Sequence, residues 1–343
     1  MKNIKDYDLE NLKKEIEGLG EKAYRATQIF EWLYIEKVSS FDDMTNLSLD
    51  LREKLKKNYS ICDFNILKKQ VSKDGTIKYL FDLLDGNAIE SVVMKYNYGN
   101  TICVSTEIGC KMGCKFCAST GVKFVRPLSA GEIVEQVIKA EQDSGERISN
   151  IVFMGIGEPF DNYDNVVKSI RIINNQKGIN IGARHISVST SGIVPKIYDL
   201  AKENIQCTLS ISLHATTNEK RSSMMPVNNI YPLEELMKAC RDYIEITKKR
   251  VSFEYALAKG YNDDIEDAKR LIKLLEGMNA HVNLIPINKI ENGKYIKSST
   301  ESIIKFRDYL NDHGITATIR RELGSDIDAA CGQLRRKNIN NQT

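Results

Sequence analysis

Three cysteines, Cys110, Cys114 and Cys117, stand on one short stretch of the chain and could bind a metal centre together. Three thiolates on one loop can face one polynuclear iron–sulfur centre, and Gly109 and Gly113 permit the backbone turns that bring the sulfur atoms together. Because the stretch offers three ligands, one iron of a 4Fe–4S cluster would stay open to an external ligand. The alternative is a structural zinc site, which normally requires four ligands in paired C-x2-C spacings.

Two further cysteines stand on either side of this stretch. Cys103 lies seven residues before Cys110, and Cys331 lies near the C-terminus. Their positions around a metal centre suggest a thiol role, although taken alone each is most often a small buried residue. With eight cysteines and no secretory signal, we do not expect a disulfide framework. The remaining cysteines outside the stretch are expected to be structural thiols: Cys62, Cys207 and Cys240.

Polar residues also stand where β-strands are expected to end. Gly157 and Glu158 follow a strand-like segment, in a sequence that is no dinucleotide fingerprint because that would need a further glycine at position 160. In an alternating strand, residues 210, 212 and 214 project to one side, which indicates a polar cavity. Two readings stay open here, since His214 could be a core histidine that donates to a carbonyl and Asn288 a turn former.

The pattern of the N-terminal part of the chain predicts a helical part followed by a β-rich part. In roughly the first 60 residues apolar side chains recur at helical spacing. From about residue 64 the pattern changes to short β-prone runs with the hairpin signals Asp74-Gly75 and Asp85-Gly86. Glu90 alternates with apolar neighbours, as a solvent-facing strand carboxylate does. We expect a helical accessory module over residues 1–62 and a β-rich extension over 63–104.

Beyond Cys117, strand-like and helix-like segments alternate. Such alternation implies a parallel sheet with right-handed crossovers, closed or partly closed into a barrel. The predicted fold class is therefore α/β, with a partial (β/α)6 barrel over residues 105–343 that follows the helical module and a short antiparallel β element. The expected strands cover 148–154, 185–189, 207–213, 251–257, 281–286 and 315–319, and the expected helices cover 130–142, 164–174, 194–201, 233–246, 265–275 and 302–310.

Composition narrows the classes of function. Of 343 residues, 42% are hydrophobic, 28% are charged and 6 are proline, which excludes a collagenous, mostly disordered or membrane-embedded protein. The formal net charge of +3 does not by itself indicate nucleic-acid binding, so any RNA contact must come from local patches. No apolar segment follows the charged N-terminus, so we expect a cytoplasmic protein. Candidate patches are Lys13, Lys14, Lys22, Arg25, Arg52, Lys54, Lys56 and Lys57, interspersed with Tyr24, Trp32 and Tyr34, and residues 335–337.

The cysteine stretch resembles the cluster-binding loop of the radical S-adenosylmethionine superfamily. In that superfamily the open iron of a 4Fe–4S cluster binds the amino and carboxylate groups of S-adenosylmethionine, and an electron from the cluster yields a 5′-deoxyadenosyl radical. Gly157 and Glu158 look like the superfamily's G-x-G-E-P motif, in which the strand edge binds the methionyl amino group. The resemblance implies further cofactor contacts from Ser189, Ser212, Leu213, His214 and Asn288.

The chain up to Gln333, including residues 184–187 and 224–226, closely resembles the methyltransferases of adenosine carbon 2 that act on 23S rRNA, at the peptidyl transferase centre, and on some tRNAs, 3′ to the anticodon. The resemblance implies that Cys331 forms S-methylcysteine, that Cys103 resolves a protein–RNA adduct through a disulfide with Cys331, and that Glu90 accepts a proton. It also implies two molecules of S-adenosylmethionine per turnover, an electron donor such as flavodoxin or ferredoxin, a monomer, and no membrane.

Three other functions stay open at this point. A sister methyltransferase modifies carbon 8 of the same rRNA adenosine, confers antibiotic resistance, and shares the cluster loop and both cysteines. A glycyl-radical activase, which acts on a protein, has no need for Cys103 or Cys331. A zinc-stabilised RNA-binding protein would lack iron altogether.

Overall fold

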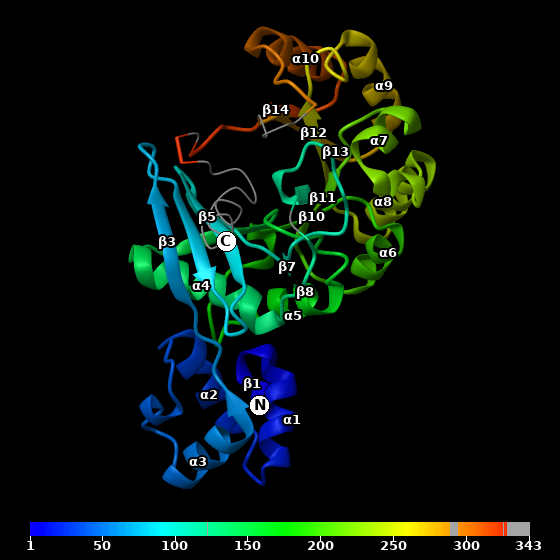
Figure 1. Ribbon diagram of the computed structural model, residues 1–343. Helices are drawn as coiled ribbons and strands as arrows, with labels where there is room; N and C mark the ends of the chain where they lie inside the picture. The colour runs from blue at the N-terminus through cyan, green and yellow to red at the C-terminus, as the bar shows by residue number, and fades with distance from the viewer. Residues whose placement is uncertain (122, 289–293, 325, 328–343) are drawn as a thin grey trace.

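The computed structural model describes residues 1–121, 123–288, 294–324, 326 and 327. Its first 60 residues are helical, as the periodicity predicted, and Figure 1 shows them at one end of the molecule. Asp8 and Ser48 cap two of these helices by accepting hydrogen bonds from first-turn amides. The elements are β1 (Lys2–Asn3), η1 (Ile4–Asp6), α1 (Leu9–Gly18), α2 (Tyr24–Tyr34), η2 (Phe41–Asp43), α3 (Leu49–Asn58) and β2 (Tyr59–Ser60), with β1 and β2 paired in parallel.

A buried ion pair attaches these helices to the rest of the chain. Lys5 Nζ lies 2.5 Å from Glu135 Oε2 on α4 (Ala130–Ser144), and both side chains are buried. The Gly131 amide, at the start of the same helix, donates to the Asp6 carboxylate at 2.8 Å. Because a buried lysine and a buried carboxylate are costly unless they are paired, this contact fixes the N-terminal helices against α4.

One open ten-stranded sheet runs through the remaining described residues, in the order β14-β13-β12-β11-β10-β9-β6-β5-β4-β3. Its antiparallel part contains both predicted hairpins, at residues 72–76 and 83–87. β6 then pairs in parallel with β9, with Ile102 opposite Ile151, so the antiparallel strands are continuous with the barrel sheet. These strands are β3 (Asn65–Val71), β4 (Ile77–Asp82), β5 (Ala88–Tyr96), β6 (Gly99–Cys103) and β9 (Ile148–Phe153).

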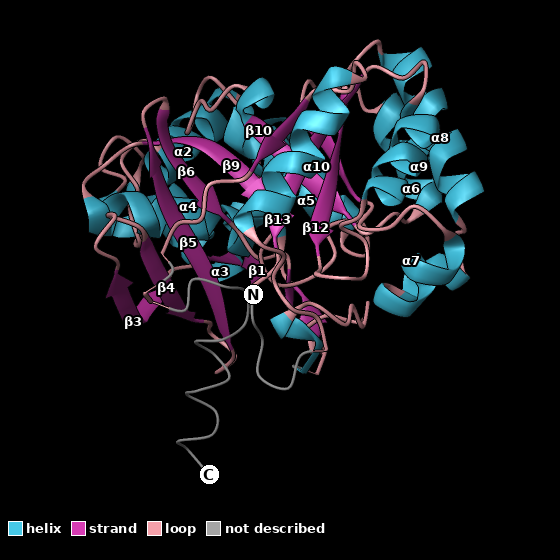
Figure 2. Ribbon diagram, turned by 90° about the horizontal axis from the view of Figure 1, so that it is seen from above, coloured by secondary structure: helices cyan, strands magenta, loops and turns pink. Residues whose placement is uncertain are grey.

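The alternating part confirms the prediction of a partial α/β barrel. The parallel strands are not closed into a ring, because β14 and β3 end the sheet on opposite sides. Figure 2 shows α6, α8 and α9 outside the strands. Beyond β9 the strands are β10 (Ile186–Thr190), β11 (Thr208–Ser212), β12 (Val251–Leu257), β13 (Ala280–Pro286) and β14 (Ala317–Ile319), and the helices besides α4 are α5 (Tyr163–Asn174), α6 (Val194–Lys202), α8 (Leu233–Thr247), α9 (Ile265–Leu275) and α10 (Thr300–Asp312).

Several short elements were not predicted, because none is long enough to show a hydrophobic period. The most important is the seven-residue helix α7 (Asn218–Met224), which lies beside the cysteine stretch: Lys115 N donates to the Met224 carbonyl at 2.9 Å. The others are β7 (Glu107–Ile108), β8 (Arg126–Pro127), and the 3-10 helices η3 (Ala118–Gly121), η4 (Ala183–His185) and η5 (Pro226–Asn229).

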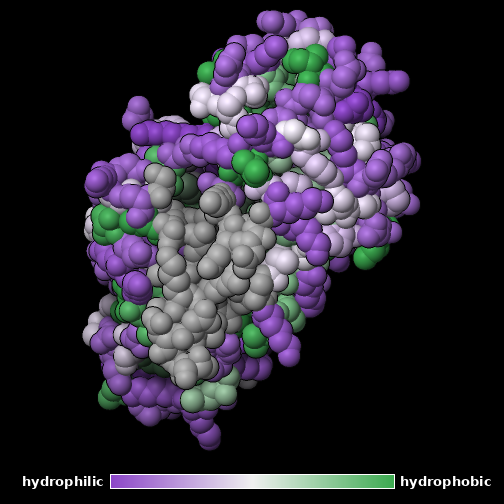
Figure 3. All heavy atoms as spheres, turned by 45° about the horizontal axis from the view of Figure 1, so that its top comes forward, coloured by the Kyte–Doolittle hydropathy of each residue, from purple (hydrophilic) through white to green (hydrophobic). Residues whose placement is uncertain are grey.

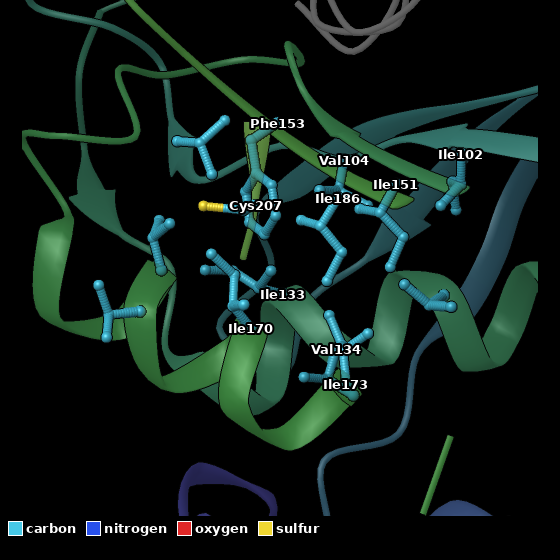
Figure 4. Packing of buried hydrophobic residues seen from close by; sticks show 14 of the residues in the cluster. Ile102, Val104, Ile133, Val134, Ile151, Phe153, Ile170, Ile173, Ile186 and Cys207 are labelled. Carbon is cyan, nitrogen blue, oxygen red and sulfur yellow. The ribbon is translucent and has the colours of Figure 1, made fainter. Parts of the chain in front are cut away.

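The hydrophobic core lies between the sheet and its helices. Figure 4 shows Ile151 and Ile186 of the strands above Val134 of α4 and Ile173 of α5. Their burial anchors the strands whose carboxyl ends carry the predicted site. A second, smaller apolar group lies beneath the cysteine stretch; it consists of Ala215, Met224, Met225, Val227, Ala258, Ile287 and Tyr295, with Met112, Cys114 and Phe116 packed against it.

The surface agrees with the composition. Outside the grey residues, the face in Figure 3 is mostly hydrophilic, with apolar side chains scattered among charged ones. Within the described part of the chain, each helix is too short or too polar to cross a membrane.

Candidate active site

A cavity of about 550 Å³ opens at the carboxyl ends of the barrel strands. It is lined mainly from the ends of β9 to β13, from β5 and β6, and from the cysteine stretch, which is where barrels of this type present functional groups. The structure brings almost every predicted site residue to this cavity: Glu90, Cys103, Cys110, Cys114, Cys117, Gly157, Glu158, Ser189, Ser212, His214 and Asn288.

Tight backbone contacts shape the cysteine stretch. Gly109 has a φ of +77°, and a Cβ there would lie 2.2 Å from the Lys123 carbonyl oxygen, so only glycine fits. Further on, the Cys117 amide donates to the Cys114 carbonyl at 3.2 Å, and the Thr120 hydroxyl donates to the same carbonyl. These contacts curl the stretch into one loop, as the two glycines in the sequence predicted.

The three thiols sit in apolar, partly buried surroundings. Burial raises the pKa of Cys110 to about 12 and that of Cys114 further, with added effects from neighbouring thiols and carboxylates. Metal coordination removes such protons outright. Among the described residues, no group of three or more His, Cys, Asp or Glu is arranged to hold a single metal ion. Three thiols on one loop are the donor type that a 4Fe–4S cluster requires, since each cysteine of such a cluster binds a different iron.

The glycines after β9 bring the backbone close to its neighbours. A Cβ on Gly155 would lie 2.6 Å from the Val104 carbonyl oxygen. Gly157 has a φ of +106°, and its Cβ would lie 2.6 Å from Cβ of Glu107. Neither position can carry a larger residue without displacing the loop. The loop that follows β9 is therefore a close-packed cradle (residues 155–159) on the cavity wall.

Glu158 ties this cradle to the next strand. Its carboxylate accepts hydrogen bonds from the Phe160 amide at 3.0 Å and from the Ser191 amide, beyond β10, at 2.7 Å. Burial raises the pKa of Glu158, and the hydrogen bonds from Ser191, Thr190 and Phe160 oppose that shift. The carboxylate therefore holds the ends of β9 and β10 together at the edge of the cavity.

His214 is a neutral hydrogen-bonding group. Its Nδ1 accepts from the Ala256 amide at 3.0 Å, which assigns the ring proton to Nε2. Burial lowers the pKa of His214 to about 3, and the nearby Arg221 adds to this. The ring packs edge-on against Phe116, with centroids 4.6 Å apart. Of the two interpretations left open for His214, the structure shows a buried ring that accepts from an amide through Nδ1 and also lines the cavity.

Glu90 and Cys103 lie on adjacent strands of the same wall. Cys103 is opposite Val92 in the β5–β6 ladder, two positions from Glu90. Glu90 is 4% exposed, so its interpretation as a solvent-facing carboxylate is wrong; its Oε2 lies 3.4 Å from Nζ of Lys78. Burial raises the pKa of Cys103 to about 11, which the charge of Arg320 partly opposes. The wall thus pairs a buried carboxylate with a buried thiol.

The chain after β14 closes the rim. Residues 320–324 line the cavity. The Gly324 amide donates to the Asp74 carboxylate at 2.8 Å, while Asp326 accepts from the Ser72 hydroxyl at 2.5 Å and the Lys73 amide at 3.2 Å. We call this reciprocal contact the Asp74–Asp326 clasp. Cys331 itself lies outside the described residues, five positions after the clasp.

Known proteins are similar to this chain over nearly its whole length. Residues 2–61 match the Ribosomal RNA large subunit methyltransferase N-terminal domain, and residues 104–272 match the Radical SAM superfamily. The Probable dual-specificity RNA methyltransferase RlmN of Clostridium novyi is 56% identical over 342 residues, covering 99% of this chain and 100% of the relative. This chain belongs to the RlmN family.

A second RlmN relative and a solved structure agree. The Geobacillus kaustophilus protein of the same name is 54% identical, covering 99% of this chain and 94% of its own. The crystal structure of a radical SAM methyltransferase from Sphaerobacter thermophilus superposes with a TM-score of 0.91 at 42% identity, covering 97% and 99% of the two chains. As a radical SAM protein, this RlmN-family chain uses a 4Fe–4S cluster and S-adenosylmethionine.

One residue that lines the cavity escaped the sequence analysis. Glu254 of β12 lines the cavity and accepts hydrogen bonds from Ser189 Oγ at 2.9 Å and Ser212 Oγ at 3.5 Å. Its other oxygen is buried and has no hydrogen-bond partner among the described residues. Burial raises the pKa of Glu254. The sequence did contain a signal for this residue, because Glu254 is the one charged residue in the mostly apolar strand 251–257, and a carboxylate is rarely buried without a partner.

Leu213 differs from the other predicted cofactor contacts. Its side chain is fully buried in the core and does not line the cavity. Its carbonyl accepts from Arg221 Nε at 3.2 Å, and its amide donates to the Glu254 carbonyl at 3.0 Å. Any part that it plays in cofactor binding must therefore come from its backbone.

Proposed function

We propose that this radical SAM RNA methyltransferase transfers a methyl group to carbon 2 of adenosine, in the peptidyl transferase centre of 23S rRNA and 3′ to the anticodon in some tRNAs. The observation that carries the proposal is the cavity, where the three-cysteine loop faces a wall containing Cys103 and Glu90. Carbon 2 of adenine is electron-poor, so an electrophilic methyl group would not react there, and a radical is required.

Different residues of the cavity would bind the 4Fe–4S cluster and S-adenosylmethionine. Cys110, Cys114 and Cys117 would hold the cluster, while Gly157 and Glu158 would bind the methionyl end of S-adenosylmethionine. Polar groups of the cavity lining that suit the remainder are Ser189, Ser212, His214 Nε2, Asn288 and Glu254. Leu213, which is outside this lining, would contribute through its backbone. When bound, S-adenosylmethionine would supply the methyl group and the 5′-deoxyadenosyl radical that removes one hydrogen atom from it, and the cluster would supply the electron for that radical and accept one electron from the later adduct.

Cys331 carries the carbon. As a thiolate it takes the methyl group of the first S-adenosylmethionine, so that a sulfur–carbon bond forms and S-adenosylhomocysteine leaves. After the loss of one hydrogen atom, the methylene carbon on Cys331 bonds to carbon 2 of the adenosine. Glu90 then accepts the proton from carbon 2, and the electron pair of that C–H bond returns to the ring. One electron also leaves the adduct, for which the cluster is the acceptor, so that the ring becomes aromatic again.

Cys103 releases the product. Its thiolate attacks the sulfur of Cys331, a disulfide forms, and the sulfur–methylene bond breaks with its electron pair moving to carbon, which takes up a proton to become the methyl group. The disulfide must be reduced before the next turnover. Burial raises the pKa of Cys103 to about 11, whereas the positive charge of Arg320 opposes that shift and favours the thiolate that this step requires.

The target adenosine must leave its stack to reach a buried carbon radical, so the RNA would be bound single-stranded or with the base flipped out. The N-terminal helices carry the basic and aromatic residues suited to hold it. We further propose a monomer that acts in the cytoplasm and receives electrons from a flavodoxin or a ferredoxin.

Nucleoside analysis tests this function. The reconstituted protein is incubated without oxygen with S-adenosylmethionine, a reductant and either 23S rRNA or tRNA, and the digested RNA is analysed by mass spectrometry. We expect 2-methyladenosine from both RNAs and none from a Cys110→Ala variant. Formation of 8-methyladenosine would assign the protein to the carbon-8 activity, and unmodified RNA in the presence of an intact cluster would contradict the proposal.

A further inference from the structure

The wall that carries Glu90 contains a fully buried lysine. Lys78 lies on β4 with no exposed side-chain area, and its Nζ is 3.4 Å from Oε2 of Glu90 on β5. In the β4–β5 ladder Lys78 is opposite Val92, and Leu80 is opposite Glu90, so the two charged side chains are diagonal neighbours on one face of the sheet. A lysine is almost never completely buried unless a charged partner holds it.

The environment of this pair explains why a charge is needed there. A buried charged group is costly unless it is paired and hydrogen-bonded, and an ammonium group beside a carboxylate both offsets that cost and fixes the direction in which the carboxylate points. Other ionisable groups on adjacent parts of the wall include Cys103 from β6, Glu254 from β12 and Arg320 after β14. Lys78 is within ion-pair distance of Glu90.

We propose that Lys78 is a positioning residue for product release: its ammonium group orients the Glu90 side chain toward the proton that it accepts from carbon 2. This inference rests on the proposed function, to which it adds Lys78 as a residue that acts when Glu90 accepts the proton. Proton acceptance follows radical formation and carbon–carbon bond formation, so Lys78 has no part in the earlier steps.

The test is a single anaerobic turnover with reconstituted enzyme, S-adenosylmethionine, reductant and an rRNA fragment. Three products are followed: 5′-deoxyadenosine, the covalent protein–RNA adduct, and free methylated RNA. For Lys78→Met we expect the first two at wild-type levels within about twofold, and release of RNA slowed about 10- to 100-fold. Lys78→Arg keeps the charge and should restore much of the release rate.

A matched control is available on the next strand. Lys69 of β3 is ion-paired with Asp143 at 2.6 Å and is 36% exposed, so Lys69→Met should release RNA at the wild-type rate. Wild-type release by Lys78→Met, or loss of adduct formation in it, would overturn the inference. If wild-type enzyme forms methyladenosine and Lys78→Met releases it normally, only this inference fails; if the wild type forms none, the proposed function fails.

A second comparison covers the case in which Lys78→Met does not fold. If the lysine acts through Glu90, then Glu90→Gln and the double variant Glu90→Gln, Lys78→Met should release RNA equally slowly. A double variant about tenfold slower than Glu90→Gln would show that Lys78 acts independently and would refute the inference.

Discussion

Replacing Glu158 by glutamine should loosen the cradle on the cavity wall. The carboxylate accepts from two backbone amides, Phe160 N at 3.0 Å and Ser191 N at 2.7 Å. A glutamine keeps one acceptor oxygen and presents an NH2 group to the other amide, so one buried N–H loses its partner. Hydrogen bonds to charged groups contribute roughly 1.5–3 kcal/mol each, and an unpaired buried donor costs about 1–3 kcal/mol.

Part of this loss is offset. Burial raises the pKa of Glu158, which means that the folded protein bears a cost for the charged group that a neutral amide avoids. We therefore expect Glu158→Gln to lower the free energy of unfolding by about 1–3 kcal/mol in urea denaturation. Because the ends of β9 and β10 separate more easily, the affinity for S-adenosylmethionine should fall about tenfold or more, measured without reductant on cluster-loaded protein.

Glu141 provides the matched control. Its carboxylate accepts from the Ile148 amide at 2.8 Å and pairs with Lys37 at 2.7 Å, but it does not line the cavity. Glu141→Gln should lose stability and keep its affinity for the cofactor. An unfolding free energy and a cofactor affinity both unchanged in Glu158→Gln would refute the reasoning about the cradle.

Three further predictions concern single residues. Cys103→Ala should accumulate the covalent protein–RNA adduct on denaturing gels, and free methylated RNA at the wild-type rate would exclude Cys103 as the resolving thiol. Because the pKa of His214 is about 3 when folded and about 6.5 when unfolded, the unfolded chain alone takes up its proton between these values, and stability falls as the pH drops through this window. Between pH 7 and 5, His214 should account for about 2 kcal/mol of the decrease in the free energy of unfolding. His214→Gln should lack this contribution, and an equal decrease in that variant would contradict the prediction. Asp326→Ala should open the clasp and slow methylation of Cys331 about tenfold, measured by peptide mass, and an unchanged rate would show that the clasp does not position Cys331.

Much of the fold was predictable because its signals are local. Apolar spacing located the barrel helices and strands to within a few residues, and Asp74-Gly75 and Asp85-Gly86 marked both hairpins. The cysteine spacing was equally local, which is why three residues could indicate a cluster loop. The helix α7 was missed because its seven mostly polar residues show no apolar period.

The contacts that could not be predicted depend on register between distant segments. The pairing of Lys78 with Glu90 depends on the alignment of β4 with β5. The alternation of apolar and polar residues predicted a solvent-facing Glu90, whereas the side chain is buried. Glu254 reaches Ser189 only because β10, β11 and β12 are adjacent and parallel. The Asp74–Asp326 clasp joins residues about 250 positions apart, a separation at which no local pattern operates.

The fate of a labelled methyl group tests the central chemistry most directly. With S-adenosylmethionine bearing three deuterium atoms on its methyl group, the account predicts a methyladenosine with two deuterium atoms and one hydrogen from solvent, and one deuterium in 5′-deoxyadenosine. Retention of all three deuterium atoms in the RNA would mean that the methyl group was transferred intact, and would contradict a radical formed on Cys331.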